Sequence, residues 1–152
     1  MSINHDALNR IHRVAYDYWQ MLAGSNARPL RIDFDPFAIA SVLPNVIMTN
    51  VIDQGRDFQF RVFGQIVRDR LIGNYTGMCL SELPNQDNRQ KVWRSYRDVA
   101  QNGQPLLSVL DYTGPFHNIR QADELYLPFF QTDGLVQSIL VAVAFDQDGY
   151  LP

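Results

Sequence analysis

The sequence contains very little cysteine and histidine. Cys79 is the only cysteine among 152 residues, and His5, His12 and His117 are the only histidines. One thiol cannot form an intramolecular disulfide, which favours a reducing compartment, and we expect a cytoplasmic protein. His5 and His12 lie seven positions apart, about 10.5 Å along a helix, which is too far to share one metal ion. We therefore expect no metal site.

The chain also lacks long hydrophobic runs and an excess of basic charge. No stretch approaches the roughly 20 apolar residues that cross a bilayer, and residues 1–10 do not have the basic start and apolar segment of a signal peptide. The formal net charge of −3 gives no general attraction to nucleic acid, whose binding depends on clustered Lys and Arg. We expect neither a membrane nor a nucleic acid as partner.

Catalytic sequence motifs are missing as well. The chain has no glycine-rich phosphate loop and no Gly-x-Ser-x-Gly nucleophile turn. One enzymatic alternative stays open, a small α+β enzyme that uses Asp111, His117, Asp123 or Glu124 as acid and base. That alternative requires these side chains to converge in one pocket with shifted pKa values.

The hydrophobic periodicity predicts several helices in one domain. A chain of 152 residues suits a single core. Apolar residues at alternating spacings of three and four predict an amphipathic helix over residues 5–23, with Asn4 as its N-cap. A short helix over residues 35–44 is expected to begin at Asp35. Shorter helical turns are expected over residues 65–72 and 78–83, and a longer helix over 87–101.

Five strands are expected, over residues 46–52, 58–63, 106–112, 119–130 and 135–146. Residues 53–57 and 131–134 have the composition of hairpin turns, so the sheet should be antiparallel. The last strand is apolar on both faces, which indicates that the sheet is covered on both sides. We divide the chain into an N-terminal helix and linker (1–28), a domain (29–146) and a tail (147–152).

Residues 33–83 carry a recognisable set of features. These are an aspartate–proline helix ending in Leu-Pro, an arginine shortly before a glycine in a hairpin, and a Thr-Gly turn: Asp35 and Pro36, Leu43 and Pro44, Arg61 and Gly64, Thr76 and Gly77. With the elements downstream, residues 16–145 resemble the PAS sensory fold, in particular a bacterial single-domain PAS subfamily.

The resemblance implies an α+β fold, with a five-stranded antiparallel sheet, helices on one face and the N-terminal amphipathic helix on the other. It also implies a non-catalytic signalling or sensory module. We expect such a module to bind a small molecule and to act through dimerisation or partner proteins.

The resemblance also bears on cofactors. Flavin-binding photosensors of this fold have the pattern Gly-x-Asn-Cys-Arg-Phe-Leu-Gln, whereas Gly77-Met-Cys79-Leu lacks the asparagine, arginine and glutamine that hold the flavin. Haem-binding sensors of this fold usually carry a histidine on the longer helix, and residues 87–101 contain none. We expect no cofactor.

Arg61 is a candidate site residue because it lies within a predicted strand, between Phe60 and Val62. A buried arginine must be paired. Asp33 or Asp35 is one candidate partner, and an anionic ligand is the alternative.

Four aromatic residues with polar groups complete the candidate ligand site. An apolar wall with a few polar groups suits a small ligand, although packing of the core explains the same residues. The candidate ligand-binding residues are Arg61, Tyr75, Trp93, Tyr96 and Tyr126.

The N-terminal helix carries a candidate pairing surface. Its apolar stripe has the seven-residue repeat of a helix-pairing seam and consists of Leu8, Ile11, Ala15, Tyr18 and Leu22. A flank of Ala7, Val14 and Trp19 offers a second apolar surface for the sheet. We predict a homodimer through this stripe. The alternative is that the whole stripe packs on its own sheet and leaves a monomer.

Overall fold

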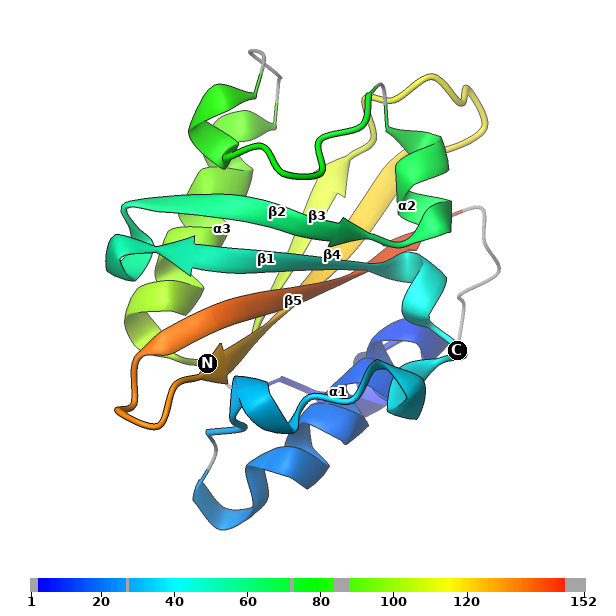
Figure 1. Cartoon of the computed structure of the whole chain (residues 1–152). Coiled ribbons are helices and arrows are strands. Elements are labelled where there is room, and N and C mark those ends of the chain that lie inside the picture. Colours follow the sequence, from blue (N-terminus) through cyan, green and yellow to red (C-terminus); the bar gives the residue numbers. More distant parts are fainter. Residues whose placement is uncertain (1–2, 27, 72, 84–87, 147–152) are drawn as a thin grey trace.

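The computed structural model describes residues 3–26, 28–71, 73–83 and 88–146. Its centre is a five-stranded antiparallel sheet with the strand order β2-β1-β5-β4-β3 (Figure 1). The strands are β1 (Val46–Ile52), β2 (Asp57–Phe63), β3 (Leu106–Asp111), β4 (Gln121–Phe130) and β5 (Val136–Phe145). The predicted strands and their antiparallel pairing are confirmed.

Helices cover both faces of this sheet, as Figure 1 shows. Helices α2 (Gln65–Arg70) and α3 (Arg89–Asn102) lie on what we call the inner face, and α1 (Arg10–Ala23) lies on the outer face. Short 3-10 turns connect these elements: η1 (His5–Ala7), η2 (Gly24–Asn26), η3 (Arg31–Asp33), η4 (Pro36–Ile39), η5 (Leu43–Asn45), η6 (Asp53–Gly55) and η7 (Leu80–Glu82).

Strands β4 and β5 are buried on both sides because their alternate residues enter two separate cores. Tyr126 and Val141 belong to the inner core with α3, whereas Leu127 and Leu140 belong to the outer core with α1. Alternate side chains of a strand point to opposite faces, so each strand supplies both cores. The expectation of a sheet covered on both sides is confirmed.

The N-terminal helix begins later than the sequence predicts, at Arg10 and not near His5. Asn9 has an extended backbone, and its side chain accepts a hydrogen bond of 2.9 Å from the backbone N–H of His12. Asn9 therefore marks the N-terminal boundary of α1, because a capping residue lies outside the helix. Asn4 caps the short turn η1 instead.

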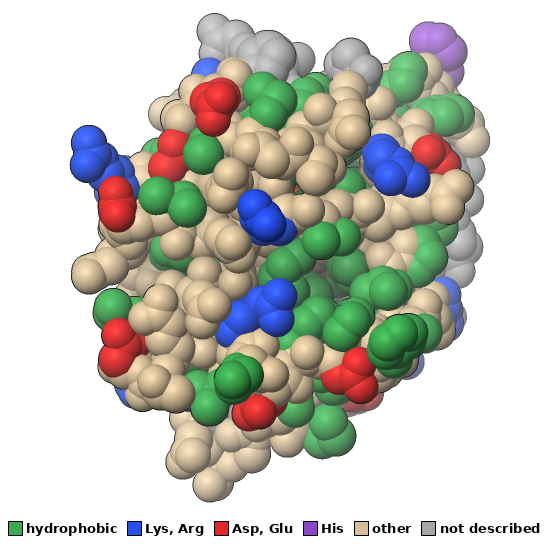
Figure 2. Space-filling model, viewed as in Figure 1, with side chains coloured by type: hydrophobic (Ala, Val, Ile, Leu, Met, Phe, Trp, Pro, Cys, Tyr) green, Lys and Arg blue, Asp and Glu red, His purple; other side chains and the backbone are tan. Residues whose placement is uncertain are grey.

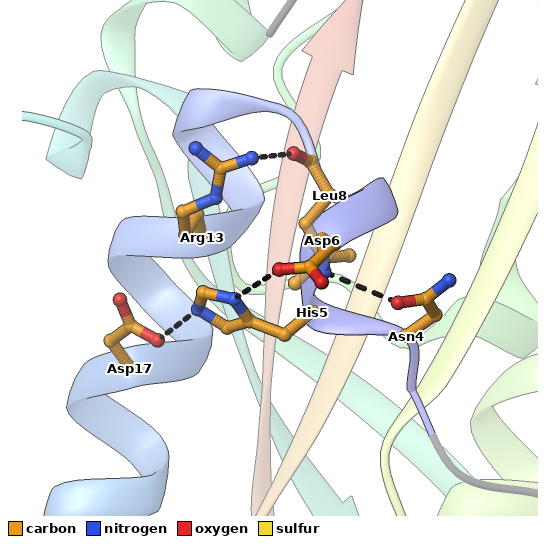
Figure 3. Close-up of polar contacts among 6 residues, drawn as sticks. All are labelled: Asn4, His5, Asp6, Leu8, Arg13 and Asp17. Carbon is orange, nitrogen blue, oxygen red and sulfur yellow. Dashed lines mark hydrogen bonds and ion pairs between the residues drawn. The ribbon is translucent and has the colours of Figure 1, made fainter.

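Polar contacts attach η1 to the first turns of α1 (Figure 3). Nε2 of His5 lies 2.7 Å from a carboxylate oxygen of Asp17, and Nη2 of Arg13 donates to the carbonyl of Leu8 at 2.7 Å. These contacts bridge the extended residues between the two helical segments.

Helix α1 docks on β4 through two side chains that reach backbone carbonyls. Nε1 of Trp19 donates to Pro128 at 2.7 Å, and Nε2 of His12 donates to Asp123 at 3.1 Å. The Nδ1 of His12 lies 3.2 Å from the amide nitrogen of Asn9 and accepts from it. Burial lowers the pKa of His12, so the neutral ring is the form that fits.

The segment before β1 forms tight turns in place of the predicted helix over residues 35–44. Asp35 does cap η4, by accepting from the backbone N–H of Phe37 at 3.0 Å, and Pro36 takes the first position. A second 3-10 turn, η5, contains Pro44 and leads directly into β1. Residues 72 and 87, at the ends of two predicted helices, and the tail 147–152 lie outside the described residues.

Candidate functional site

Two adjoining cavities lie between the inner face of the sheet and the helices that cover it. The larger has a volume of about 330 Å³ and the smaller about 100 Å³. They share the lining residues Ile47, Leu71, Tyr75, Val92 and Glu124, and we call them together the inner cavity. The larger volume lies at the lower end of the range of ligand sites, about 300–1,000 Å³.

Glu124 is the one acidic residue that lines both parts of the inner cavity. It lies on β4 with only 9% of its surface exposed, and its Oε1 accepts a 2.6 Å hydrogen bond from the hydroxyl of Tyr126. Burial raises the pKa of Glu124 to about 7, although the hydrogen bond from Tyr126 and the charge of Lys91 both lower it. The carboxyl group therefore changes charge near neutral pH.

A second pair of polar groups lies behind Glu124 in the inner core. The hydroxyls of Thr49 and Tyr96 are 2.9 Å apart, and the rings of Tyr96 and Tyr126 pack edge to face with 5.1 Å between their centroids. Burial raises the pKa of both tyrosines. These neutral hydroxyls fix the aromatic rings that support the carboxyl group of Glu124.

Charged side chains occur at the edges of the inner cavity. Arg70 and the exposed Asp111 line the larger part, and Arg89 lines the smaller. The guanidinium carbon of Arg70 lies 4.8 Å from the ring centroid of Phe145, a cation–π distance. The cavity thus combines apolar walls with a small number of polar groups, as ligand sites do.

Three of the five predicted ligand-binding residues lie at or next to the inner cavity. Tyr75 lines both parts and Tyr96 lines the smaller, while Tyr126 is fully buried behind Glu124. Trp93 is not among the lining residues of the two cavities; it is half-buried and packs edge-on against Phe58, with 5.7 Å between ring centroids.

The expectation that Arg61 is buried and paired with Asp33 or Asp35 is wrong. Arg61 is exposed, both aspartates are exposed, and no ion pair joins them among the described residues. Strand alternation is the cause, since Arg61 lies on the face of the edge strand β2 opposite the buried Phe58 and Phe60. A β-bulge also leaves Arg61 as the extra residue, because Met48 pairs with Val62 and Thr49 pairs with Phe60. It does not line the inner cavity.

The four residues of the enzymatic alternative do not converge. Glu124 and Asp111 both line the larger cavity. Asp123 lies between Ala122 and Glu124 on β4 and therefore points to the outer face. His117 is exposed in the segment between β3 and β4.

Most of the predicted pairing stripe is buried in the outer core of its own subunit. Leu8, Ile11 and Ala15 are buried there, and Tyr18 and Leu22 are half-buried against it.

Hydrophobic side chains gather around a shallow hollow on the face seen in Figure 2. The most exposed large hydrophobic residues of the described chain are Met21, Ile32 and Phe37, at 66%, 84% and 84%.

Sequence reasoning did not assign Glu124 to the ligand site. The signal that could have found it is the strand period, since residues 122, 124 and 126 share one face of β4. Aliphatic lining residues such as Val92 and Leu71 carry no comparable signal, because the same residue types fill ordinary cores.

Within residues 3–26, 28–71, 73–83 and 88–146, no three His, Cys, Asp or Glu side chains gather so that they could hold a metal ion. In the same part of the chain, no helix has both the length and the hydropathy that a bilayer crossing requires.

Comparisons with known proteins agree with this architecture. A family profile described as PAS domain matches residues 8–144. Among solved structures, the chain is similar to a sensory box sensor histidine kinase from Vibrio cholerae, with 13% sequence identity and a TM-score of 0.51. The similarity covers 72% of this chain and 89% of that chain, and at this identity it shows the fold alone. No curated protein matches the chain.

Proposed function

The chain belongs to the PAS domain family, and we propose that it is a sensory module that binds a small organic molecule in the inner cavity. The observation that carries the proposal is the inner cavity itself, with the buried carboxyl group of Glu124 where its two parts adjoin. Apolar walls with one buried polar group favour a small, mostly apolar ligand held in a defined orientation.

Two other functions have less support. A fully packed interior would have favoured a module that only binds other proteins. The cavity of about 330 Å³ argues against such a pure interaction module. An acid–base enzyme needs its catalytic groups in one place. Asp111 and Glu124 share the larger cavity, but Asp123 points to the opposite face of β4 and His117 is exposed outside it.

A screen of small organic molecules by NMR tests the sensory function. Ala122 lines the larger cavity, so Ala122→Leu fills part of the space that a ligand would occupy. We expect molecules that shift the amide signals of β4 and β5 in the wild type and lose this effect in Ala122→Leu. Ala38 is exposed in η4, and Ala38→Leu is the matched control that should bind them normally. Molecules that bind Ala122→Leu as tightly as the wild type would contradict the proposed site.

We further propose that the module acts as a homodimer in the cytoplasm. Met21 supports this proposal because its side chain is 66% exposed on α1, next to the half-buried Leu22 of the predicted stripe. An exposed apolar residue at such a position suits an interface.

Light scattering tests the homodimer. We expect a mass of two subunits for the wild type and a shift toward one subunit for Met21→Glu, with little effect of a charge at the exposed Gln20. A wild-type mass of one subunit at high micromolar concentration would contradict the dimer and leave the ligand site untouched.

A further inference from the structure

Glu124 is a buried acid that forms no ion pair with another residue of the described part of the chain. Among the described residues, no Lys, Arg or His nitrogen forms an ion pair with its carboxyl group, and the hydroxyl of Tyr126 gives the one hydrogen bond found there, to Oε1. No fully buried side-chain oxygen of the described residues lacks a partner. The second oxygen of Glu124 is therefore accessible from the inner cavity that this residue lines.

The cations closest to the inner cavity are directed to other groups. Nη2 of Arg89 donates to the carbonyl of Ser81 at 2.8 Å, and Nζ of Lys91 donates to the carbonyl of Val109 at 2.5 Å. The guanidinium group of Arg70 lies over the ring of Phe145. Among the described residues, none of these side chains forms an ion pair with Glu124, although the charge of Lys91 lowers its pKa. A cation that enters the cavity can therefore pair with the carboxyl group.

Burial raises the pKa of Glu124, but the hydrogen bond from Tyr126 favours the ionised form that a cationic ligand would meet. The hydroxyl of Tyr126 is oriented as a donor, and a donor hydrogen bond stabilises a carboxylate more than a carboxylic acid. Asp111 is the other acid that lines the larger cavity, and because it is exposed it adds negative charge where the cavity meets solvent. An anionic ligand would meet both acids, whereas a cation would neutralise the buried one.

The walls around Glu124 determine the rest of the ligand. Residues of the sheet and of both inner helices present apolar side chains to the larger cavity, including Ile47, Val67, Leu71, Val92 and Val143. We propose that the inner cavity binds a small organic cation, an amine on an apolar body, whose ammonium group donates to the carboxylate of Glu124. This proposal rests on the sensory function above and names the ligand class.

Three probes of one size and different charge test the ligand class near neutral pH: benzylamine, benzyl alcohol and benzoate. Their affinities are measured by NMR titration of the wild type, Glu124→Gln and Asp111→Asn. We expect benzylamine to bind the wild type more tightly than either other probe. Glu124→Gln should weaken benzylamine by about 10- to 100-fold, the usual effect of losing a charged hydrogen-bond partner. Asp111→Asn should weaken it by less than about threefold, because its carboxylate is exposed.

The outcomes separate the ligand class from the sensory function. Benzoate or benzyl alcohol binding as tightly as benzylamine, or benzylamine binding equally to Glu124→Gln, would overturn the preference for cations. If a probe bound in either of these ways and Ala122→Leu abolished its binding, the inner cavity would remain supported as a ligand site, but not as a site for cations. Failure of all three probes to bind the wild type would count against both proposals. The wild-type comparison needs no variant, so a folding defect in Glu124→Gln cannot hide the result.

Discussion

The hydroxyl of Tyr126 donates a 2.6 Å hydrogen bond to the carboxyl group of Glu124, two positions earlier on the inner face of β4. This bond holds the acid at the wall of the inner cavity, although burial raises its pKa to about 7. The chain therefore keeps a carboxyl group near its point of charge change, in a place that a ligand can reach.

The first prediction concerns stability and pH. Glu124 has a pKa of about 7 in the folded chain, above its ordinary value of 4.5, so the folded state holds this proton more tightly than the unfolded state. Its stabilising contribution is complete below about pH 4.5 and is lost as the pH rises through about 7. The pKa difference corresponds to about 3 kcal/mol. Urea unfolding at about pH 5 and pH 8 measures this loss.

Glu124→Gln is the control for this pH dependence. A glutamine keeps an oxygen that accepts from Tyr126 and does not titrate. We expect the free energy of unfolding of Glu124→Gln to change less between these pH values than that of the wild type. Equal pH dependence of the two proteins would show that Glu124 ionises as it does in water.

The second prediction concerns His12 at the contact between α1 and the sheet. Burial lowers its pKa, although the carbonyl and charge of Asp123 and the backbone of Ala142 act in the opposite direction. A lowered pKa means that His12 contributes stability above about pH 6.5, which is lost as the pH falls through its folded-state value. NMR titration of the His12 ring should give a midpoint below 6.5. A midpoint at or above that value would contradict the buried neutral ring.

The third prediction concerns Gly64, which follows β2. A Cβ atom at this position would overlap the backbone oxygens of Leu43 and Pro44, which cannot move away cheaply. We expect Gly64→Ala to cost about 1–3 kcal/mol of stability. Gly73→Ala is the matched control: its Cβ would make an ordinary contact at 3.4 Å with Tyr75, and its cost should stay within about 0.5 kcal/mol. Equal urea midpoints for both variants would refute the close approach.

The fourth prediction concerns the exposed bulge residue. Arg61→Ala should change stability by no more than about 0.5 kcal/mol, because Arg61 is exposed and forms no ion pair among the described residues. Phe60→Ala, one position earlier, removes a buried ring and should cost about 3–5 kcal/mol. A large loss for Arg61→Ala, measured by urea unfolding, would restore the pairing that the sequence suggested.

Local chemistry explains why the sheet could be predicted from the sequence. The turns at Gly55 and Gly134, both with positive φ, set two antiparallel hairpins, and the unbroken apolar run of β5 required cover on both faces. These signals depend on neighbours in the chain. The start of α1 was less predictable, because two asparagines, Asn4 and Asn9, can each cap a helical turn and both do.

The candidate site was only partly predictable, for reasons of register and space. A bulge adds one residue to β2, which puts Arg61 outside the paired register and returns Phe63 to the core. Tyr75 and Tyr96 line the smaller cavity, and the sequence could single them out because aromatic residues with hydroxyl groups are conspicuous. A cavity is a property of packing across the sheet, and no local pattern distinguishes a lining residue such as Val92 from a core residue.

The surface against which the apolar stripe of α1 packs could not be deduced from the sequence period of the stripe. Leu8 and Ile11 fit a helix-pairing seam and the outer face of a sheet equally well, because both surfaces require apolar residues three and four positions apart. In the structure they enter the outer core with Leu127 and Leu140.

The most direct test of the proposed site is a carbon-13 NMR titration of the Glu124 carboxyl group, with and without benzylamine. Without the amine, we expect a midpoint near 7, and with saturating amine a clear shift to lower pH, because the ammonium group stabilises the carboxylate. A midpoint near 4.5 without the amine, or one that benzylamine leaves unchanged, would contradict a buried carboxyl group that binds cations in the inner cavity.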